Sequence, residues 1–403
     1  RVLNGTLYPA NKGNSYLDLS TIYGDNDDTN GKLRDGPYLR LIDRPGNGGA
    51  YNKGLKNITV RQVPPSFSET SLVADLTPPA IDANEALVSG DLRCSENIQL
   101  CLIHTIWIRE HNYWVDQLKT RPELKNNNES LFQQARRIVI AEYQRVVYEE
   151  YLPAVLGFNM PSYTGYDETV YADTSTHFAG AAFRYGHSIV RPYDLIDGCT
   201  GKSIVVHPDF QFPDSHPNRF YFVGKTVGFP ENGNPQNFTK QQLDYTPILM
   251  LSLASGTHGD GVDNVLLSML RGTAAEFDLM VTSSLRNIPG VSDMVSIDIG
   301  RGRLLGLLDY NSYRAVYHPA GDIYANSQCD ISAPVDPLAC FQLITSNTTI
   351  AQHLQTIYGK VNRIDAIIGM FAESKSAPTQ PLPPTISNIL KDEFNRKRAA
   401  DRF

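Results

Sequence analysis

The sequence predicts a mainly α-helical protein, with one large helical domain over residues 1–403, long loops and little β structure. The first observation behind this prediction is a series of long segments whose apolar residues recur at helical spacing. The second is composition, because 41% hydrophobic and 20% charged residues are typical of a globular chain with a sizeable core. A chain of 403 residues has room for two or three ordinary domains, but it shows no internal repeat.

Two long helices are predicted in the first half of the chain, from about Ser95 to Lys119 and over 131–151. The second is expected to stop at Pro153, because proline lacks the N–H that continues a helix. The residues expected to face the core are Leu100, Ile103, Trp107 and Trp114, then Ile138, Val139, Val146 and Val147. Later helical patterns cover 262–285, a segment beginning at Tyr310, 351–371 and 385–402, with 374–384 as a linker.

The net charge argues against nucleic acid as a partner. It is −7, with a sequence pI near 5.7, and no basic stripe is present to neutralise phosphates. The short basic run 396–398 is interpreted as the solvated face of a terminal helix. No apolar run approaches the roughly 18 residues that cross a bilayer, so no membrane span is expected.

Five N-glycosylation sequons predict an extracellular or vesicular glycoprotein. They begin at Asn4, Asn57, Asn128, Asn237 and Asn347, all in polar surroundings. The chain starts at Arg1 and shows no signal peptide, so we expect a processed or partial chain.

The five cysteines fit an oxidising compartment only loosely. Cys329 and Cys340 flank a proline-containing loop and are the best candidates for a disulfide. Cys94 and Cys101 would lie about 10 Å apart along one helix, which is too far for a bridge. The remaining odd cysteine is either free or paired elsewhere.

A polar loop near the N-terminus carries oxygen-bearing residues at alternating positions. In an extended loop Asn14, Tyr16, Asp18 and Ser20 fall on one side. Side-chain and carbonyl oxygens in this pattern suit a hard cation, and calcium is the natural occupant. A turn in which Asp18 and Ser20 act as local caps explains the spacing equally well.

His187 stands near the centre of 176–194, a stretch without proline until Pro192. Arg184 lies three residues earlier, so on a helix the two share a face. A neutral imidazole beside a fixed guanidinium suits a metal ligand next to an anion, such as iron with a haem carboxylate. Taken alone, a histidine in a helix is more often structural.

Two further clusters of charged residues have a structural and a chemical interpretation. Arg93 and Glu96 are three apart at the start of a helix, where an intrahelical ion pair is the simpler explanation. The alternative is a guanidinium aimed at a reacting oxygen and a carboxylate that touches a cofactor. Arg301-Gly302-Arg303, preceded by Asp298, offers cations for haem propionates and an acceptor for a histidine N–H.

Five blocks of sequence carry a family resemblance over nearly the whole chain. They are Ser15-Tyr-Leu-Asp18-Leu-Ser20 with Ile22-Tyr-Gly24, Gly90-Asp-Leu-Arg93-Cys-Ser-Glu96 followed by His104-Thr-Ile-Trp-Ile-Arg-Glu-His111-Asn, Ala182-Phe-Arg184-Tyr-Gly-His187, Arg301-Gly-Arg303, and Asp401-Arg-Phe403. In this order and spacing the chain resembles the animal-type haem peroxidases of the peroxidase–cyclooxygenase superfamily. One block would be suggestive, whereas five in order are highly specific.

The resemblance implies haem b as the cofactor. It implies that His187 is the proximal iron ligand and that Arg93 is the distal arginine, which stabilises negative charge on the departing peroxide oxygen. Glu96 is similar to the carboxylate that forms an ester with a haem methyl group. Arg184 and Arg301 are similar to the partners of the haem propionates.

The resemblance also implies a role for Asp298 and for the N-terminal loop. Asp298 stands where mammalian members carry asparagine, and we expect it to accept a hydrogen bond from His187 and to lower the iron reduction potential. The calcium ligands implied are Asn14, Tyr16 through its carbonyl, Asp18 and Ser20.

Three departures from the family pattern stand out. Asn97 follows Glu96, where one member carries a methionine that bonds to haem, and Arg303-Leu-Leu-Gly306 replaces Arg-Asp-His-Gly. The family's distal helix, with its histidine base, belongs upstream of the calcium loop. We expect it in a segment before Arg1, the alternative being a homologue without that base; His104 and His111 are expected to be structural.

The expected function is a secreted haem peroxidase. It would reduce hydrogen peroxide and oxidise a small donor, namely a halide, thiocyanate or a phenol. The alternative is a peroxidase-homology module with little activity, serving adhesion or matrix roles or forming part of a dual oxidase. A cyclooxygenase-type fatty-acid oxygenase is disfavoured, because no Tyr-His-Trp-His segment is present to supply a radical tyrosine.

Overall fold

The computed structural model describes residues 2–3, 6–7, 13–39, 90–91, 98–190, 194–196, 203–205, 270, 273–286 and 293–402. The α-helices are α1 (Ser20–Tyr23), α2 (Asp27–Leu33), α3 (Ile98–Leu118), α4 (Asn128–Val146), α5 (Leu152–Leu156), α6 (Thr176–Gly180), α10 (Ser283–Arg286), α11 (Met294–Leu304), α12 (Tyr310–Tyr317), α13 (Leu338–Gln342), α14 (Thr348–Tyr358), α15 (Ala366–Ala372) and α16 (Pro384–Ala399). Four tighter or wider turns are the π-turn η4 (Val147–Tyr151) and the 3₁₀ turns η5 (Ala182–His187), η8 (Ile323–Ala325) and η9 (Val361–Arg363).

The β structure consists of short antiparallel hairpins, as the fold prediction requires. The pairs in the described part of the chain are β1 (Val2–Leu3) with β2 (Thr6–Leu7), β3 (Arg34–Asp35) with β4 (Tyr38–Leu39), and β5 (Asp194–Ile196) with β6 (Ser203–Val205). The prediction of a mainly α fold is confirmed.

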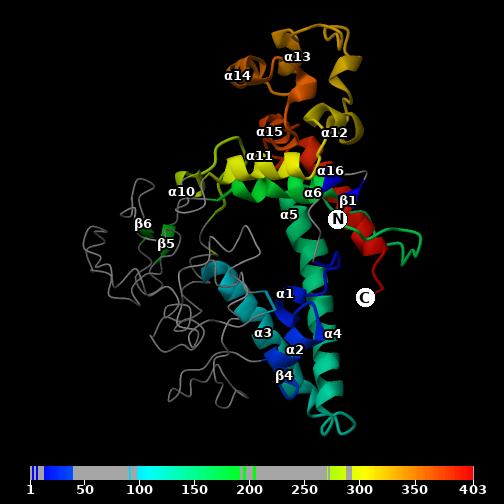
Figure 1. Cartoon of the computed structure of the whole chain (residues 1–403). Helices are drawn as coiled ribbons and strands as arrows, with labels where there is room; N and C mark the ends of the chain where they lie inside the picture. Colours follow the sequence, from blue (N-terminus) through cyan, green and yellow to red (C-terminus); the bar gives the residue numbers. More distant parts are fainter. Residues whose placement is uncertain are drawn as a thin grey trace.

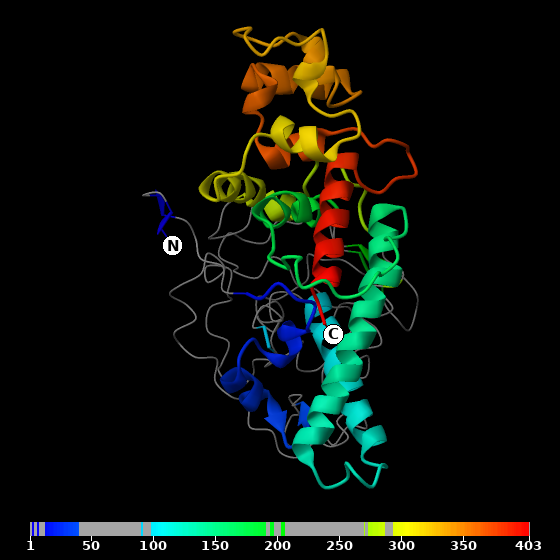
Figure 2. The same ribbon diagram turned by 90° about the vertical axis from the view of Figure 1, so that its right-hand side faces the viewer.

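A long helical column organises the molecule (Figure 1). It is formed by α4, η4 and α5 in direct succession, and α3 packs along the α4 part. Helices α12 to α15 gather beyond the α5 end, while α1 and α2 lie by α3 and α4. The turned view shows α16 running beside the α5 end of the column (Figure 2). Two contacts fix that neighbour, a ring contact of Tyr148 with Phe394 and a hydrogen bond from the Tyr148 hydroxyl to the Phe394 carbonyl.

The core face of α3 differs from the prediction. Ile103 is 38% exposed, while His104, Ile108, His111 and Val115 are buried. His111 can be buried because Tyr23 O–H donates to its Nδ1 and its Nε2–H donates to the Pro37 carbonyl, each at 3.0 Å. The buried face of α3 is built partly from histidines, so the spacing of apolar residues alone does not indicate it. The expectation that His111 is structural is confirmed.

The expected end of the second long helix at Pro153 is wrong. The chain passes through a π-turn, in which Leu152 N donates to the Val147 carbonyl, and Pro153 then lies in the first turn of α5. Proline is tolerated there because a first-turn residue needs no intrahelical donor. Val146, predicted to face the core, is 39% exposed, whereas Val147 is buried.

Two later helix predictions also need correction. The segment 351–371 is not one helix, because Gly359 adopts a left-handed φ of 68° and ends α14 before η9 and α15 begin. Within 262–285, residues 273–282 are not helical and α10 begins only at Ser283; 262–269 lie outside the described residues.

The predicted helices at Tyr310 and at 385–402 are present as α12 and α16, although α16 ends at Ala399. The predicted disulfide joins Cys329 and Cys340. No helix in the described ranges is long and apolar enough to cross a membrane.

The main hydrophobic core lies where η5, α12, α15 and α16 meet. Tyr310 is fully buried there and lies against Gly369, at which an added Cβ would stand 2.1 Å from the tyrosine ring. This close approach fixes α15 against α12. The segment that ends at His187 packs against the same core through Ala181, Ala182 and Tyr185.

Candidate functional site

His187 ends a 3₁₀ turn that is packed tightly against the core. Helix α6 stops at Gly180, Ala181 breaks it with φ −137° and ψ −68°, and η5 continues to His187. Ala181 and Ala182 are both 0% exposed, and such small side chains let the turn lie close to α15 and α16. The predicted helix around His187 is therefore two short helical pieces with a bend between them.

The start of this segment is fastened to α16. Ser175 caps α6 by accepting a hydrogen bond from Phe178 N, and its hydroxyl donates to Glu393 Oε2 at 2.8 Å. Glu393 is 0% exposed and its charge is met by Lys397 Nζ at 3.2 Å and by the Arg396 guanidinium. A buried carboxylate held by two cations makes a rigid anchor for the residues leading to His187.

His187 forms a hydrogen bond with a buried carboxylate. Its Nδ1–H donates to Asp298 Oδ2 at 2.5 Å. The Asp298 side chain is 1% exposed and comes from α11, whereas the His187 side chain is 24% exposed. Within the described part of the chain, no hydrogen bond engages Nε2 of His187. The ring therefore has its Nδ1 tautomer fixed and its opposite nitrogen available as a ligand.

Arg184 and Arg301 converge on the same carboxylate. Arg184 Nε and Arg301 Nη1 each lie 3.9 Å from Asp298 Oδ1, an atom that is buried and accepts no hydrogen bond. Arg301 shares a face of α11 with Asp298 because the two are three residues apart. The structure thus brings together four of the predicted site residues. Within this cluster the two guanidiniums offset the negative charge of Asp298.

Arg303 does not belong to this cluster. Its Nε and Nη2 bind both carboxylate oxygens of Asp365 at 2.8 Å, and the Arg303 guanidinium holds the pKa of Asp365 below its usual value. Positions two apart on a helix point in different directions, so Arg301 and Arg303 cannot serve one group. Arg303 is thus held by Asp365 instead of Asp298, and its expected role toward the haem propionates stays a prediction.

The N-terminal loop is closed by its own hydrogen bonds. Asn14 Nδ2 donates to Asp18 Oδ2 at 3.0 Å, Ser20 N donates to Asp18 Oδ1 at 3.0 Å, and Tyr16 N donates to Asn14 Oδ1 at 2.9 Å. The Asn14 amide turns its nitrogen to the carboxylate, where a cation would require oxygen. This geometry is that of the capped turn, and it does not fit a bound cation as it stands. Within the described ranges no cluster of acidic, cysteine or histidine side chains could hold a metal ion.

Two predicted residues, Arg93 and Glu96, lie outside the described residues. One contact near the site was not predicted, the 2.5 Å approach of the Tyr151 and Tyr185 hydroxyl oxygens. Tyr185 stands inside the recognised block two residues before His187, but no local pattern indicates a partner 34 residues away. Tyr151 is the last residue of the π-turn η4, a departure from the helix that the sequence did not predict.

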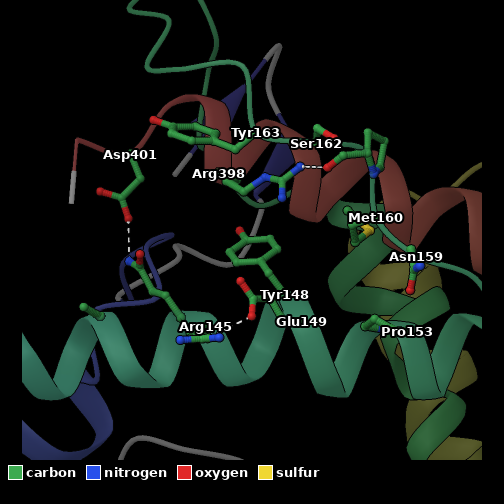
Figure 3. Close-up of a pocket in the computed structure, with 13 residues that line it drawn as sticks. Arg145, Tyr148, Glu149, Pro153, Asn159, Met160, Ser162, Tyr163, Arg398 and Asp401 are labelled. Carbon is green, nitrogen blue, oxygen red and sulfur yellow. Dashed lines mark hydrogen bonds and ion pairs between the residues drawn. The ribbon is translucent and has the colours of Figure 1, made fainter.

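A hollow of about 610 Å³ opens between α4, η4, the loop at 159–163 and the end of α16 (Figure 3). Tyr148 and Tyr163 stand on either side of Arg398, whose guanidinium carbon is 5.0 Å and 5.8 Å from their ring centres. Arg145 pairs with Glu149, and Asp401 with Gln144. None of the residues that line it belongs to the His187–Asp298 cluster.

Comparison with known proteins identifies the family. A sequence model of the animal haem peroxidase family matches residues 5–403. The chain belongs to the animal haem peroxidase family. Its recognition from the five sequence blocks is thereby confirmed.

Curated relatives of this chain share about a quarter of its residues. It is 27% identical to peroxinectin A of Dictyostelium discoideum over 78% of this chain and 49% of the relative. It is 29% identical to a peroxidase of Drosophila melanogaster, over 96% of this chain and 49% of the relative. It is 26% identical to the mouse peroxidasin homolog, over 100% of this chain and 24% of the relative. The haem peroxidase chain thus spans about half or less of these proteins.

Solved structures show the same fold. Peroxidase A from Dictyostelium discoideum superposes with a TM-score of 0.68 at 24% identity, covering 96% of this chain and 63% of that one. The fatty acid α-dioxygenase of Oryza sativa superposes with a TM-score of 0.59 at 16% identity, covering 96% and 58%. At these identities the likeness describes the fold of the haem peroxidase chain.

Proposed function

We propose that this chain binds haem b through Nε2 of His187 and reduces hydrogen peroxide while oxidising a small donor, a halide, thiocyanate or a phenol. The observation that carries the proposal is the His187–Asp298 pair. A histidine whose Nδ1–H is fixed by a buried carboxylate, and whose Nε2 is available, is the donor arrangement of a histidine-ligated iron. The buried Oδ1 of Asp298 lies near the guanidiniums of Arg184 and Arg301, so positive and negative charges are fixed close to that ligand.

Each described site residue has a defined task in this proposal. Bound haem would supply the electrons that break the peroxide O–O bond. Asp298 accepts the Nδ1 proton of His187 in a hydrogen bond, which orients the ring and makes it more electron-rich. Arg184 and Arg301 hold negative charge at the same edge, of Asp298 in this structure and, in the proposal, of the haem propionates.

Arg93 and Glu96 enter the proposal through the family resemblance alone. Arg93 is assigned to the peroxide side, where a fixed cation stabilises the oxygen that leaves with negative charge. Glu96 is assigned to an ester bond with a haem methyl group. Haem extraction into acidified butanone tests the second assignment, because an ester-linked haem stays with the protein and a Glu96→Gln variant would release it.

The test of the whole proposal is haem binding and peroxide turnover by the full chain. Purified protein supplied with haem should show a Soret band, and His187→Ala should lose it. His353→Ala, a change at an exposed histidine on α14, is the matched control and should keep the band. A Soret band of equal strength in His187→Ala would reject the assignment, and absence of donor oxidation with peroxide would reject the activity.

We also propose a secreted or vesicular location and a glycosylated chain. Asn128 and Asn347 are the sequon residues within the described ranges, and both are exposed. The Cys329–Cys340 disulfide suits an oxidising compartment. A mass shift on treatment with an N-glycosidase, smaller in the double variant Asn128→Gln with Asn347→Gln than in the parent, tests the modification at these two sites.

Calcium at the N-terminal loop is a separate proposal, supported by the residue types at Asn14, Tyr16, Asp18 and Ser20. Because the Asn14 amide faces the carboxylate with its nitrogen, binding requires that amide to turn and release Tyr16 N. Calorimetric titration with calcium should give a heat of binding that Asp18→Ala abolishes. Equal heats in the two proteins would reject the site.

A further inference from the structure

Two tyrosine hydroxyls meet, and one of them comes from the turn that carries the proposed iron ligand. The hydroxyl oxygens of Tyr151 and Tyr185 are 2.5 Å apart, and either phenol can be the donor. Tyr185 is 5% exposed and shares the 3₁₀ turn η5 with His187, two residues away. Tyr151 is 37% exposed. The pair therefore joins a buried residue of the turn that carries His187 to a residue that is partly exposed to solvent.

Tyr151 is the last residue of the π-turn η4. In η4 the Leu152 N–H reaches back to the Val147 carbonyl, five residues away, and Pro153 has no N–H to offer the Glu149 carbonyl. The wider turn changes the direction in which Tyr151 leaves the helical column relative to an unbroken α-helix. Turns of this kind are rare and are frequent at functional sites.

Tyr148, in the same π-turn, shows the ordinary alternative. Its hydroxyl donates to the backbone carbonyl of Phe394, a partner that only accepts. In the Tyr151–Tyr185 pair either oxygen can be the donor and the other the acceptor, so the hydrogen bond between them can run in either direction. A buried hydroxyl that needs only a hydrogen-bond acceptor can use a backbone carbonyl, as Tyr148 does. A second phenol as partner is not needed for that purpose.

A tyrosine side chain carries its proton at neutral pH, because the ordinary pKa of a phenol is about 10. A neutral phenol that loses an electron must also lose its proton, because the cation it would otherwise become is a strong acid. The hydrogen bond between the two hydroxyls gives Tyr185 a place to send that proton, and Tyr151, a residue that is 37% exposed, is the member of the pair nearer to water.

We propose that Tyr185 and Tyr151 form a relay that carries oxidising equivalents from haem at His187 to phenolic donors at the surface beside Tyr151. The relay rests on the proposed function, which supplies hydrogen peroxide as the oxidant. It adds a second place of donor oxidation, separate from the haem edge.

The relay is balanced at each step. Tyr185 gives one electron to the peroxide-oxidised cofactor, its proton passes to the Tyr151 oxygen, and the original Tyr151 proton goes to water. The O–H bond of Tyr151 then breaks and its hydrogen atom returns to the Tyr185 oxygen, which leaves the radical on Tyr151. A donor phenol finally gives one hydrogen atom to Tyr151 and becomes a phenoxyl radical. The net change is one electron delivered to the cofactor, one proton released and one phenol oxidised.

The donor class follows from the chemistry of the last step. Transfer of a hydrogen atom between two phenols breaks one O–H bond and forms a nearly equal one, so it needs little driving force. A halide has no such hydrogen and must react at the haem itself. The relay therefore serves phenols, including tyrosine side chains on molecules too large to approach the haem.

Radical trapping on the haem-loaded full chain tests the relay. Hydrogen peroxide is added without donor, together with the spin trap 2-methyl-2-nitrosopropane, and the labelled peptide is identified by mass spectrometry. We expect the adduct on Tyr151 in the parent protein and its loss in Tyr185→Phe. Tyr148→Phe is the matched control and should keep it, because that hydroxyl contacts a carbonyl instead of a phenol.

Tyr151→Phe supplies a second arm, should Tyr185→Phe fail to fold. The label should move to Tyr185, and oxidation of a tyrosine peptide tethered to agarose beads should fall about tenfold relative to iodide oxidation by the same variant. An adduct that stays on Tyr151 in Tyr185→Phe, or a peptide-to-iodide ratio unaffected by Tyr151→Phe, overturns the relay alone. A Soret band that does not respond to peroxide overturns the proposed function, and the relay falls with it.

Discussion

Nδ1 of His187 and Oδ2 of Asp298 meet at 2.5 Å although the two residues are 111 positions apart. One comes from a 3₁₀ turn and the other from α11, so the contact exists only when both elements are packed on the shared core. The carboxylate is almost fully buried and faces two arginines. Its charge is therefore placed to act on the imidazole and on whatever that imidazole binds.

Replacing the charge of Asp298 should raise the iron reduction potential. In Asp298→Asn a neutral acceptor takes the place of a carboxylate, and the loss of about 1.4 kcal/mol of charge-assisted hydrogen bonding corresponds to roughly 60 mV for one electron. Spectroelectrochemical titration of the haem-loaded protein measures the shift. Asp365→Asn removes an equal charge at the Arg303 pair and should leave the potential in place. Equal potentials in parent and Asp298→Asn would contradict the role.

Burial of His111 should make the protein acid-sensitive. Burial lowers the pKa of His111 to about 4, and protonation at Nδ1 would break the bond from Tyr23. In the unfolded state His111 has a pKa near 6.5, so between pH 6.5 and pH 4 it is protonated there but not in the folded state. The free energy of unfolding therefore falls as the pH drops from about 6.5 to about 4. The expected loss is roughly 3 kcal/mol.

Urea unfolding at several pH values measures this loss. His111→Gln should be less stable at neutral pH and should show a shallower fall in the free energy of unfolding over that range. His353→Gln, at an exposed position, should follow the parent curve. A parent-like slope in His111→Gln would mean that other groups cause the acid sensitivity.

A methyl group at Gly369 should destabilise the core on which the site rests. Gly369→Ala places a carbon 2.1 Å from the Tyr310 ring, and forced repacking of a dense core costs about 1–3 kcal/mol. Gly300→Ala, in α11, meets no atom of the described residues within 4 Å and should be neutral or stabilising by about 0.5–1 kcal/mol. Thermal unfolding of the two variants should separate them, and a parent-like Gly369→Ala would show that α15 can move.

Removing the disulfide should lower stability without removing the fold. The Cys329–Cys340 bond closes a short loop with a separation of 11 residues, for which chain entropy gives about 3 kcal/mol. Cys329→Ala with Cys340→Ala should therefore unfold at lower denaturant than the parent. Unchanged unfolding of the double variant would indicate that the packing around Cys340 alone holds this loop.

Features that depend on local spacing could be predicted from the sequence. The mainly α fold, the helix at Tyr310, the terminal helix and the disulfide are all read from nearby residues. The family blocks indicated His187, Asp298, Arg184 and Arg301, which the fold brings together. Their roles as haem partners stay predictions.

Other features depend on contacts that spacing cannot show. Pro153 was expected to end a helix, but the π-turn before it lets the column continue. Ile103 was expected in the core because histidines are not counted as core residues, although His111 is fully buried once Tyr23 and Pro37 complete its hydrogen bonds. Tyr151 could not be paired with Tyr185 without knowing where that π-turn points.

Lys397 of α16 also binds the loop that carries Ser15. Its ammonium donates to the Ser15 carbonyl, 382 positions away, and to Thr174 Oγ1. A ribosome that has made this loop must therefore add 382 further residues before the loop meets its partner. Contacts of such long range are slow to form, so this part of the fold should form only after Lys397 has left the ribosome, and the earlier segments would meanwhile need shielding by chaperones.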